Sequence, residues 1–251
     1  MAGIDLSCIC LSHGRTWLLR EIVECFRRQR MGGATSELLI VDDCSSVEYV
    51  CDVPGVRILK LDRWMWDMGE KTNVALAEAR GRYFALTDDD DLFMPMFAAD
   101  ALRHAGGLLG YRPGLCWKLG VGGLESEPIR PLLNGGIFDR EHAIRGGGVA
   151  TREWNDVALW RHFRSTGEVN QFAPSPRKMR TIYRWDGKEW HHSGEPGEPD
   201  RARAELFRAK VLQDRRFISG RVALCPGWER DYEAMVAGAV ARKTNQTREA
   251  E

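Results

Sequence analysis

The sequence lacks the signatures of several large protein classes. Its 251 residues contain no run of about 18 apolar residues, so no transmembrane helix is expected. There is no G-x-x-x-x-G-K-[ST] phosphate loop, and no G-x-G-x-x-G follows the first apolar run. The charges of the 36 basic and 36 acidic residues cancel, so the formal net charge is zero. This argues against a general nucleic-acid or membrane-surface binder.

Paired cysteines are also missing. The seven cysteines are scattered, their number is odd, and no C-x-x-C pair occurs. Neither a disulfide framework nor a zinc site is therefore expected. No charged N-terminal region precedes an apolar stretch, so no signal peptide is expected. These features predict a reducing, cytoplasmic location and leave peripheral contact with a membrane open.

What the chain does contain is enough apolar material for a folded core, at 43% of its residues. Over residues 1–105, short apolar runs alternate with segments of helical spacing. This alternation predicts parallel βαβ units and an α/β fold with a mostly parallel central sheet flanked by helices. Residues 106–193 show shorter strands separated by glycines, and residues 200–251 predict a C-terminal helical extension with a frayed, polar end.

Four consecutive aspartates, Asp88 to Asp91, follow a buried-strand pattern. In open parallel sheets, ligands bind beyond the carboxyl ends of strands. Because alternate residues of an extended chain point the same way, Asp88 and Asp90 would face one side, and Asp89 and Asp91 the other. A divalent cation would relieve the repulsion between these carboxylates. The alternative is a solvated acidic turn that caps the next helix.

A second acidic pair, Asp42 and Asp43, follows another apolar run. If the strands are parallel, both acidic sites lie at one edge of the sheet, close to the turn at residues 12–15. Such an edge can hold a nucleotide whose base or ribose donates to a carboxylate. Without a phosphate loop, a metal and single basic groups would have to offset the phosphate charge. A turn or N-cap role is the simpler alternative for this pair taken alone.

Four segments, taken in order, resemble family 2 glycosyltransferases of the GT-A fold. They are residues 6–15, 37–46, 69–73 and 79–91. Two departures are visible, because Cys44 stands where glycine is common and His13-Gly14 where Tyr-Asn is common. The resemblance implies a nucleotide-diphosphate sugar donor, with a UDP-sugar favoured. It also implies a Mn²⁺ or Mg²⁺ ion and inversion at the anomeric carbon.

The resemblance further implies roles in donor binding. Ser12 and Arg15 would line the nucleotide pocket, and Asp42 would accept a hydrogen bond from the base. Lys71 would reach the diphosphate, and Asn73 matches an asparagine on a helix of the family.

Within the aspartate tetrad, Asp88 and Asp90 match the D-x-D pair of the family. Asp88 would face the ribose or the metal, and Asp90 would bind the metal. Asp91 would be a neighbouring support, and Asp89 is the member expected to tolerate replacement.

The second half matches a helix that carries an acidic pair in the family. Asn155 replaces the glutamate of that pair, whereas Asp156 matches the aspartate. Asp156 would be the general base that deprotonates the acceptor hydroxyl, with Glu153 as the fallback and a solvated helix carboxylate as the alternative. His191 or His192 would approach the metal, and an imidazole suits Mn²⁺ better than Mg²⁺.

The sequence therefore predicts a metal-dependent, inverting glycosyltransferase that moves a sugar onto an acceptor hydroxyl. The acceptor class stays open between a glycan, a lipid-linked molecule and a modified nucleic acid. One alternative is a sugar-nucleotide pyrophosphorylase, although the turn at residues 12–15 is poor in glycine for that role. The other is a non-catalytic nucleotide- or sugar-binding module, which Asn155 keeps open.

Overall fold

The structure is a computed structural model that describes residues 3–128, 135–148, 155–166, 168–184 and 201–250, with only the backbone described at 155–158 and 247–250. The strands are β1 (Ile4–Ser12), β2 (Ser36–Asp42), β3 (Val47–Val50), β4 (Val56–Lys60), β5 (Gly81–Leu86), β6 (Leu92–Phe93), β7 (Gly110–Pro113), β8 (Leu115–Gly120), β9 (Gly123–Pro128), β10 (Ile137–Asp139), β11 (Val169–Phe172), β12 (Thr181–Arg184) and β13 (Gly220–Ala223). The helices are α1 (Thr16–Arg27), α2 (Met68–Glu78), α3 (Phe97–Ala105), α4 (Arg140–Arg145), α5 (Asn155–Thr166), the 3₁₀ helix η1 (Pro176–Lys178), α6 (Arg201–Gln213) and α7 (Tyr232–Ala250).

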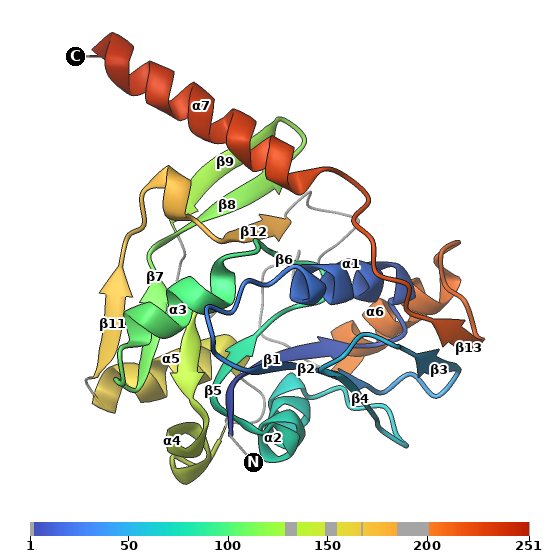
Figure 1. The fold of residues 1–251 in the computed structure, drawn as a ribbon. Helices are drawn as coiled ribbons and strands as arrows, with labels where there is room; N and C mark the ends of the chain where they lie inside the picture. Colours follow the sequence, from blue (N-terminus) through green and yellow to red (C-terminus); the bar gives the residue numbers. More distant parts are fainter. Residues whose placement is uncertain (1–2, 129–134, 149–154, 167, 185–200, 251) are drawn as a thin grey trace.

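A seven-stranded sheet in the order β11-β7-β10-β5-β1-β2-β4 forms the centre of the molecule (Figure 1). β1 runs parallel to both β2 and β5, and β2 runs parallel to β4. The parallel βαβ arrangement predicted for residues 1–105 is therefore confirmed. β10 is antiparallel to β5 and β7, which makes the complete sheet mixed.

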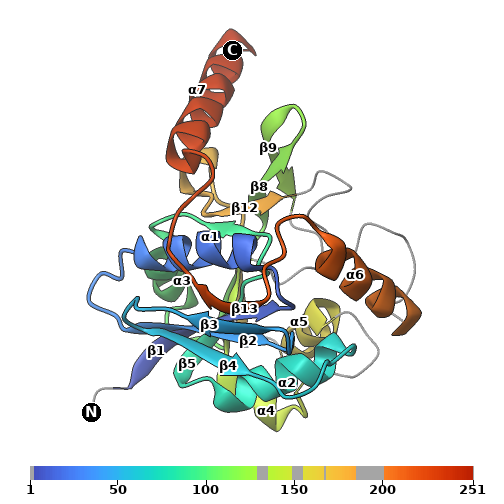
Figure 2. The same cartoon turned by 90° about the vertical axis from the view of Figure 1, so that its right-hand side faces the viewer.

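Helices cover both faces of this sheet, which explains why its central strands are apolar on both sides. Cys8 and Cys10 of β1 pack in the core that α1 and α3 help to form. Ile9 and Leu11 point the other way and pack with α2, α4 and α5. Figure 2 shows α1 and α3 above the sheet and α2 and α4 below it. Burial raises the pKa of the Cys8 thiol to about 12, so this cysteine serves as a small apolar side chain.

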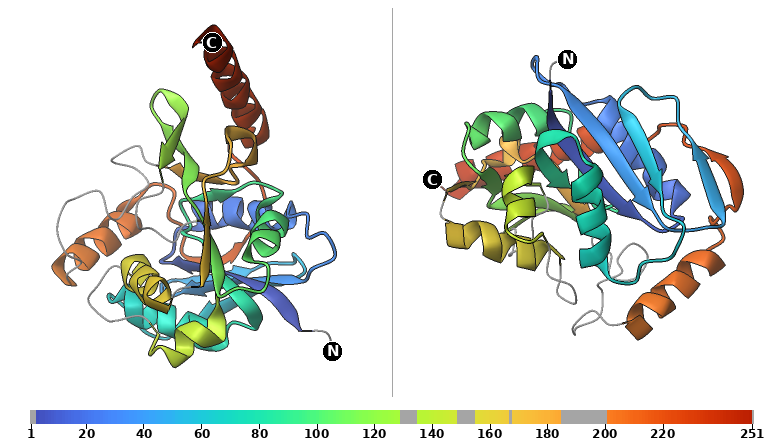
Figure 3. Two further views of the ribbon diagram at one scale, coloured as in Figure 1. Left: turned by 90° about the vertical axis from the view of Figure 1, so that its left-hand side faces the viewer. Right: turned by 90° about the horizontal axis from the view of Figure 1, so that it is seen from below.

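The C-terminal part of the chain returns to the N-terminal half. β13 pairs with β3 in a two-stranded sheet, and a third sheet has the order β6-β12-β8-β9. α7 projects from the body of the molecule next to the β8–β9 hairpin. α6 lies apart from α7, near the ends of the central strands (Figures 1 and 3). Of the helices in the described ranges, none is long and apolar enough to cross a membrane.

Two details differ from the sequence-based expectation. α7 continues to Ala250, so the predicted frayed end is wrong. Its polar residues include Arg, Lys, Gln and Glu, which are good helix formers even without apolar periodicity. β3 and β13, each four residues long, were not predicted, and each becomes a strand by pairing with a distant segment.

The start of β5 depends on a glycine, and this generates a test of the fold. A Cβ at Gly81 would meet the backbone N of Ser7, the backbone O of Tyr83 at 2.7 Å and the backbone C of Leu6 at 2.8 Å. We predict that Gly81→Ala lowers the free energy of unfolding by about 3 kcal/mol, because backbone atoms of a packed sheet cannot move away cheaply. Urea unfolding measures the change.

The matched control is Gly122→Ala, where an added Cβ would meet nothing within 4 Å. Its unfolding midpoint should stay close to that of the wild type. Equal stability of the two variants would contradict the close packing of β5 against β1.

Candidate functional site

The acidic residues predicted at strand ends meet at one edge of the large sheet. Ser12 and Asp42 are the last residues of β1 and β2 and are paired in register. The tetrad, residues 88–91, follows β5, which is the other parallel neighbour of β1. This edge, formed by the carboxyl ends of adjacent parallel strands, is where α/β sheets bind ligands.

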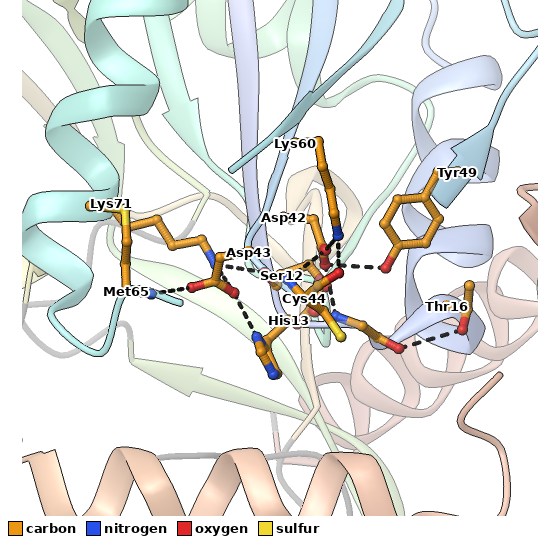
Figure 4. Close-up of polar contacts among 12 residues, drawn as sticks. Ser12, His13, Thr16, Asp42, Asp43, Cys44, Tyr49, Lys60, Met65 and Lys71 are labelled. Atoms are coloured by element: carbon orange, nitrogen blue, oxygen red, sulfur yellow. Dashed lines mark hydrogen bonds and ion pairs between the residues drawn. The ribbon is translucent and has the colours of Figure 1, made fainter. Parts of the chain in front are cut away.

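Asp42 is fully buried and already has four hydrogen-bond donors. Its carboxylate accepts from the backbone N of Gly14 at 2.7 Å and of Cys44 at 2.9 Å. It also accepts from the Tyr49 hydroxyl at 3.1 Å and from Lys60 Nζ at 2.8 Å (Figure 4). Because a carboxylate offers about four acceptor positions, a nucleobase would have to displace one of these donors. Asp42 thus ties the loops after β1 and β2 together.

Asp43 forms a separate network on the other side of the same loop (Figure 4). Its Oδ1 lies 2.6 Å from His13 Nδ1 and 3.0 Å from Lys71 Nζ, and its Oδ2 accepts from the backbone N of Met65 at 2.8 Å. Burial raises the pKa of Asp43. The hydrogen bond with His13, the Lys71 charge and the Met65 amide lower it by more, so that the resulting pKa is about 2. Asp43 is therefore a carboxylate at neutral pH.

Lys71 lies between Asp43 and the backbone O of Ser12, to which its Nζ donates. Its side chain is 3% exposed. In this arrangement the ammonium joins α2 to the loops after β1 and β2. Lys71 was predicted to contact a diphosphate. To do so, its ammonium would have to leave Asp43.

Asp89 is the most enclosed member of the tetrad, with no exposed surface. Its carboxylate accepts from Ser12 Oγ at 2.7 Å and forms an ion pair with Arg15. Burial raises the pKa of Asp89 to about 6; Arg15 and Ser12 oppose the rise, and the Asp90 charge adds to it. These contacts do not support the expectation that Asp89 tolerates replacement. The alternation of facing assumed extended backbone, whereas the tetrad forms a turn in which Asp91 N donates to Asp88 O at 3.1 Å.

Arg184 of β12 holds the backbone of this turn. Its guanidinium donates to the carbonyl oxygens of Asp90 and Asp89, and its backbone N donates to Asp91 Oδ1 at 3.2 Å. The same guanidinium pairs with Glu21 of α1, and both side chains are buried. Sequence reasoning named neither residue for this role, although Arg184 lies in the segment that precedes the two histidines.

Asp88 and Asp90 remain the candidates for a divalent ion. Asp88 is half-buried, whereas the Asp90 side chain is 5% exposed and its Oδ2 lies 3.5 Å from Arg15 NH1. Within the described part of the chain, no group of three or more His, Cys, Asp or Glu side chains is arranged to hold a metal ion. Two carboxylates suit Mn²⁺ or Mg²⁺ chemically, because such ions commonly take their other ligands from substrate phosphates and water.

The other predicted site residues are only partly described. Asn73 is half-buried on α2, and Gly148 approaches its amide so closely that a Cβ would collide with it. The backbone of Asp156 lies in the first turn of α5, which contacts α2. The side chain of Asp156 lies outside the described part, and so do Glu153, His191 and His192 entirely.

α6 and the segment after it add residues that the sequence did not point to. The Phe207 ring lies 5.1 Å from the Arg15 guanidinium, and the Arg208 guanidinium lies 5.1 Å from the Trp64 ring. Phe217 packs so closely on Gly14 that a Cβ there would be 2.9 Å from the Phe217 ring. The C-terminal part of the chain therefore covers the same sheet edge that carries Ser12 and the tetrad.

Comparison with known families agrees with the segments singled out above. Residues 7–107 match the model of the family described as "Glycosyl transferase family 2". This region contains the strand ends, the tetrad and the α2 residues on which the resemblance rested, so the resemblance is confirmed. No curated protein matches the chain.

Solved structures with a similar fold include TarS of S. aureus. A structure of TarS is 14% identical with a TM-score of 0.57, covering 84% of this chain and 40% of that chain. TarS 1–349 in complex with UDP-GlcNAc is 14% identical with a TM-score of 0.59, covering 84% of this chain and 68% of that one. The predicted GT-A architecture is confirmed. The chain spans about 40% of the length of the first TarS chain.

The Asp43–Lys71 pair generates a test of how the site is held together. We predict that Lys71→Met lowers the free energy of unfolding at neutral pH by about 3–5 kcal/mol, because it leaves a buried carboxylate without its ammonium partner. The pKa of Asp43 is about 2 in the folded protein and about 3.9 when unfolded. The stability that Asp43 contributes is therefore complete above about pH 4 and is lost as the pH falls through 2.

Lys71 is one cause of that low pKa, so the gap in stability between wild type and Lys71→Met should narrow below about pH 4. Urea unfolding at several pH values measures it. Lys178→Met, which changes an exposed lysine, is the control and should match the wild type throughout. A gap that does not depend on pH would show that the Asp43 charge is not what Lys71 stabilises.

Proposed function

Because residues 7–107 of this chain carry a family 2 glycosyltransferase sequence, we propose that the protein transfers a sugar from a nucleotide-diphosphate donor to an acceptor hydroxyl. The observation that carries the proposal is the position of the acidic tetrad within this matched region. It lies past the carboxyl end of β5, beside Ser12 and Arg15. A UDP-sugar is the favoured donor, since the similar fold of TarS 1–349 has been solved with UDP-GlcNAc.

Donor binding is assigned to the edge formed by the ends of β1, β2 and β5. Arg15 stays positively charged and lies against Asp89 and Asp90, so it can offset part of the phosphate charge brought by the donor. Asp88, as the most open member of the tetrad, faces the donor. Asp88 and Asp90 would hold Mn²⁺ or Mg²⁺, which when bound supplies positive charge to the departing diphosphate.

We assign the general base to Asp156 on α5. In the reaction, the acceptor oxygen forms a bond to the anomeric carbon as the bond from that carbon to the diphosphate breaks. The Asp156 carboxylate takes the proton of the acceptor hydroxyl, and the nucleoside diphosphate leaves with the bonding electron pair. A single in-line displacement of this kind inverts the anomeric carbon. The contact between α5 and α2 supports the assignment, because α2 borders the donor edge through Lys71.

The decisive assay is release of the nucleoside diphosphate from UDP-sugars in the presence of Mn²⁺, with a panel of hydroxyl acceptors. Transfer to an acceptor supports the proposal. Formation of a nucleoside triphosphate that depends on pyrophosphate would instead establish a pyrophosphorylase. Binding of nucleotide sugars with no turnover across the panel would establish a binding module.

The metal assignment gives the prediction for this site. We predict that Asp90→Ala abolishes turnover while the protein stays folded, because Arg15 keeps its ion pair with Asp89 when Asp90 is lost. Diphosphate release at fixed Mn²⁺ measures turnover, and thermal unfolding measures folding.

The control is Asp52→Ala, which removes an exposed carboxylate from the loop between β3 and β4 and should leave turnover unchanged. Full activity of Asp90→Ala at the same metal concentration would refute the assignment of Asp90 to the metal.

A further inference from the structure

One buried ring nitrogen at the donor edge has no hydrogen-bond partner in the described part of the chain. His13 is 7% exposed, and its Nδ1 is held by Asp43 at 2.6 Å. Its Nε2 is buried and has no hydrogen-bond partner in the described part of the chain. Leaving such an atom unpaired costs about 1–3 kcal/mol, so a buried polar atom of this kind calls for an explanation.

The Asp43 contact places a proton on Nδ1. The carboxylate can only accept, because its pKa of about 2 keeps it ionised at neutral pH. Nδ1 of His13 therefore carries the proton that Asp43 accepts, and in the neutral ring Nε2 presents a lone pair. Met65 N and Lys71 hold Asp43 from two further sides, so the direction of the imidazole is set before any ligand arrives.

The position of His13 connects this lone pair with the donor. His13 directly follows Ser12, whose hydroxyl contacts Asp89 of the tetrad. Figure 4 shows the His13 imidazole bound to Asp43 through one ring nitrogen, with its other ring nitrogen on the side of α6. On that side, Arg208 of α6 lies over Trp64, the residue before Met65. Arg208 Nε is likewise buried without a hydrogen-bond partner in the described residues.

Asp42, the residue expected to accept from the base, has its four acceptor positions occupied. We propose that His13 is a specificity-determining residue of the donor site, whose Nε2 accepts a hydrogen bond from a ring N–H of the nucleobase. This proposal rests on the proposed function. It selects bases with a protonated ring nitrogen on their pairing edge, as in uracil and guanine. Cytosine and adenine present a lone pair there, which repels that of Nε2.

The test compares UDP with N3-methyl-UDP, which lacks the ring N–H. Calorimetry on the wild type should give a Kd for UDP about tenfold lower than for the methylated nucleotide, since one hydrogen bond is worth up to about 1.4 kcal/mol. In His13→Asn, the amide nitrogen replaces Nδ1 and keeps the Asp43 contact, but the Nε2 acceptor is gone. This variant should bind the two nucleotides within about twofold of each other.

The matched control is His104→Asn, because His104 stacks on Tyr111 and Phe172 at the other end of the sheet. This variant should keep the wild-type ratio between the Kd for N3-methyl-UDP and the Kd for UDP. A tenfold preference that survives in His13→Asn overturns the role of His13 and leaves the proposed function standing. The wild-type protein alone gives a second measurement: equal binding of UDP, N3-methyl-UDP and CDP also overturns it. Failure of the wild type to bind any nucleoside diphosphate or nucleotide sugar would refute the proposed function itself.

Discussion

The buried ion pair between Arg184 and Glu21 is the interaction on which the geometry of the acidic turn depends. Arg184 donates to the backbone of the tetrad, and Glu21 accepts from the backbone N of Glu229 and the Tyr232 hydroxyl, each at 3.0 Å. Buried charges persist only when they are paired and hydrogen-bonded. One network therefore joins α1, β12, the segment before α7 and the first residue of α7 to the turn that follows β5. Removing either charge would leave the other buried without compensation.

The rest of the edge follows the same rule, because most of its buried carboxylates have a cation of their own. Asp42 has Lys60, Asp43 has Lys71, and Asp89 has Arg15. These ion pairs fix the conformations of the loops after β1, β2 and β5 before a ligand binds. A ligand that enters such a site does not have to order the loops, which lowers the entropic cost of binding. Asp88 is the most exposed member of the tetrad, and the far nitrogen of His13 has no partner among the described residues.

The C-terminal segment makes the edge a composite of distant parts of the chain. β13 pairs with β3, Phe217 packs on Gly14, and α6 places Phe207 next to Arg15. The region that matches the family ends at residue 107, so these contacts come from outside it. The core of this sheet edge thus lies in the matched region, whereas its cover comes from the remainder of the chain.

The sequence by itself determined the central strands, their parallel orientation and the meeting of Ser12, Asp42 and the tetrad at one edge. Local periodicity identifies strands, and parallel neighbours must end at the same edge. Only the tertiary structure decided which donors and cations each of these acidic groups meets. The prediction for Asp89 assumed that side chains alternate along an extended chain, and it failed because the tetrad forms a turn. No local sequence pattern predicts that Arg184 contacts Glu21 or that Asp42 contacts Lys60. Such pairs form between segments far apart in the sequence, where packing and the cost of burying charge select the partners.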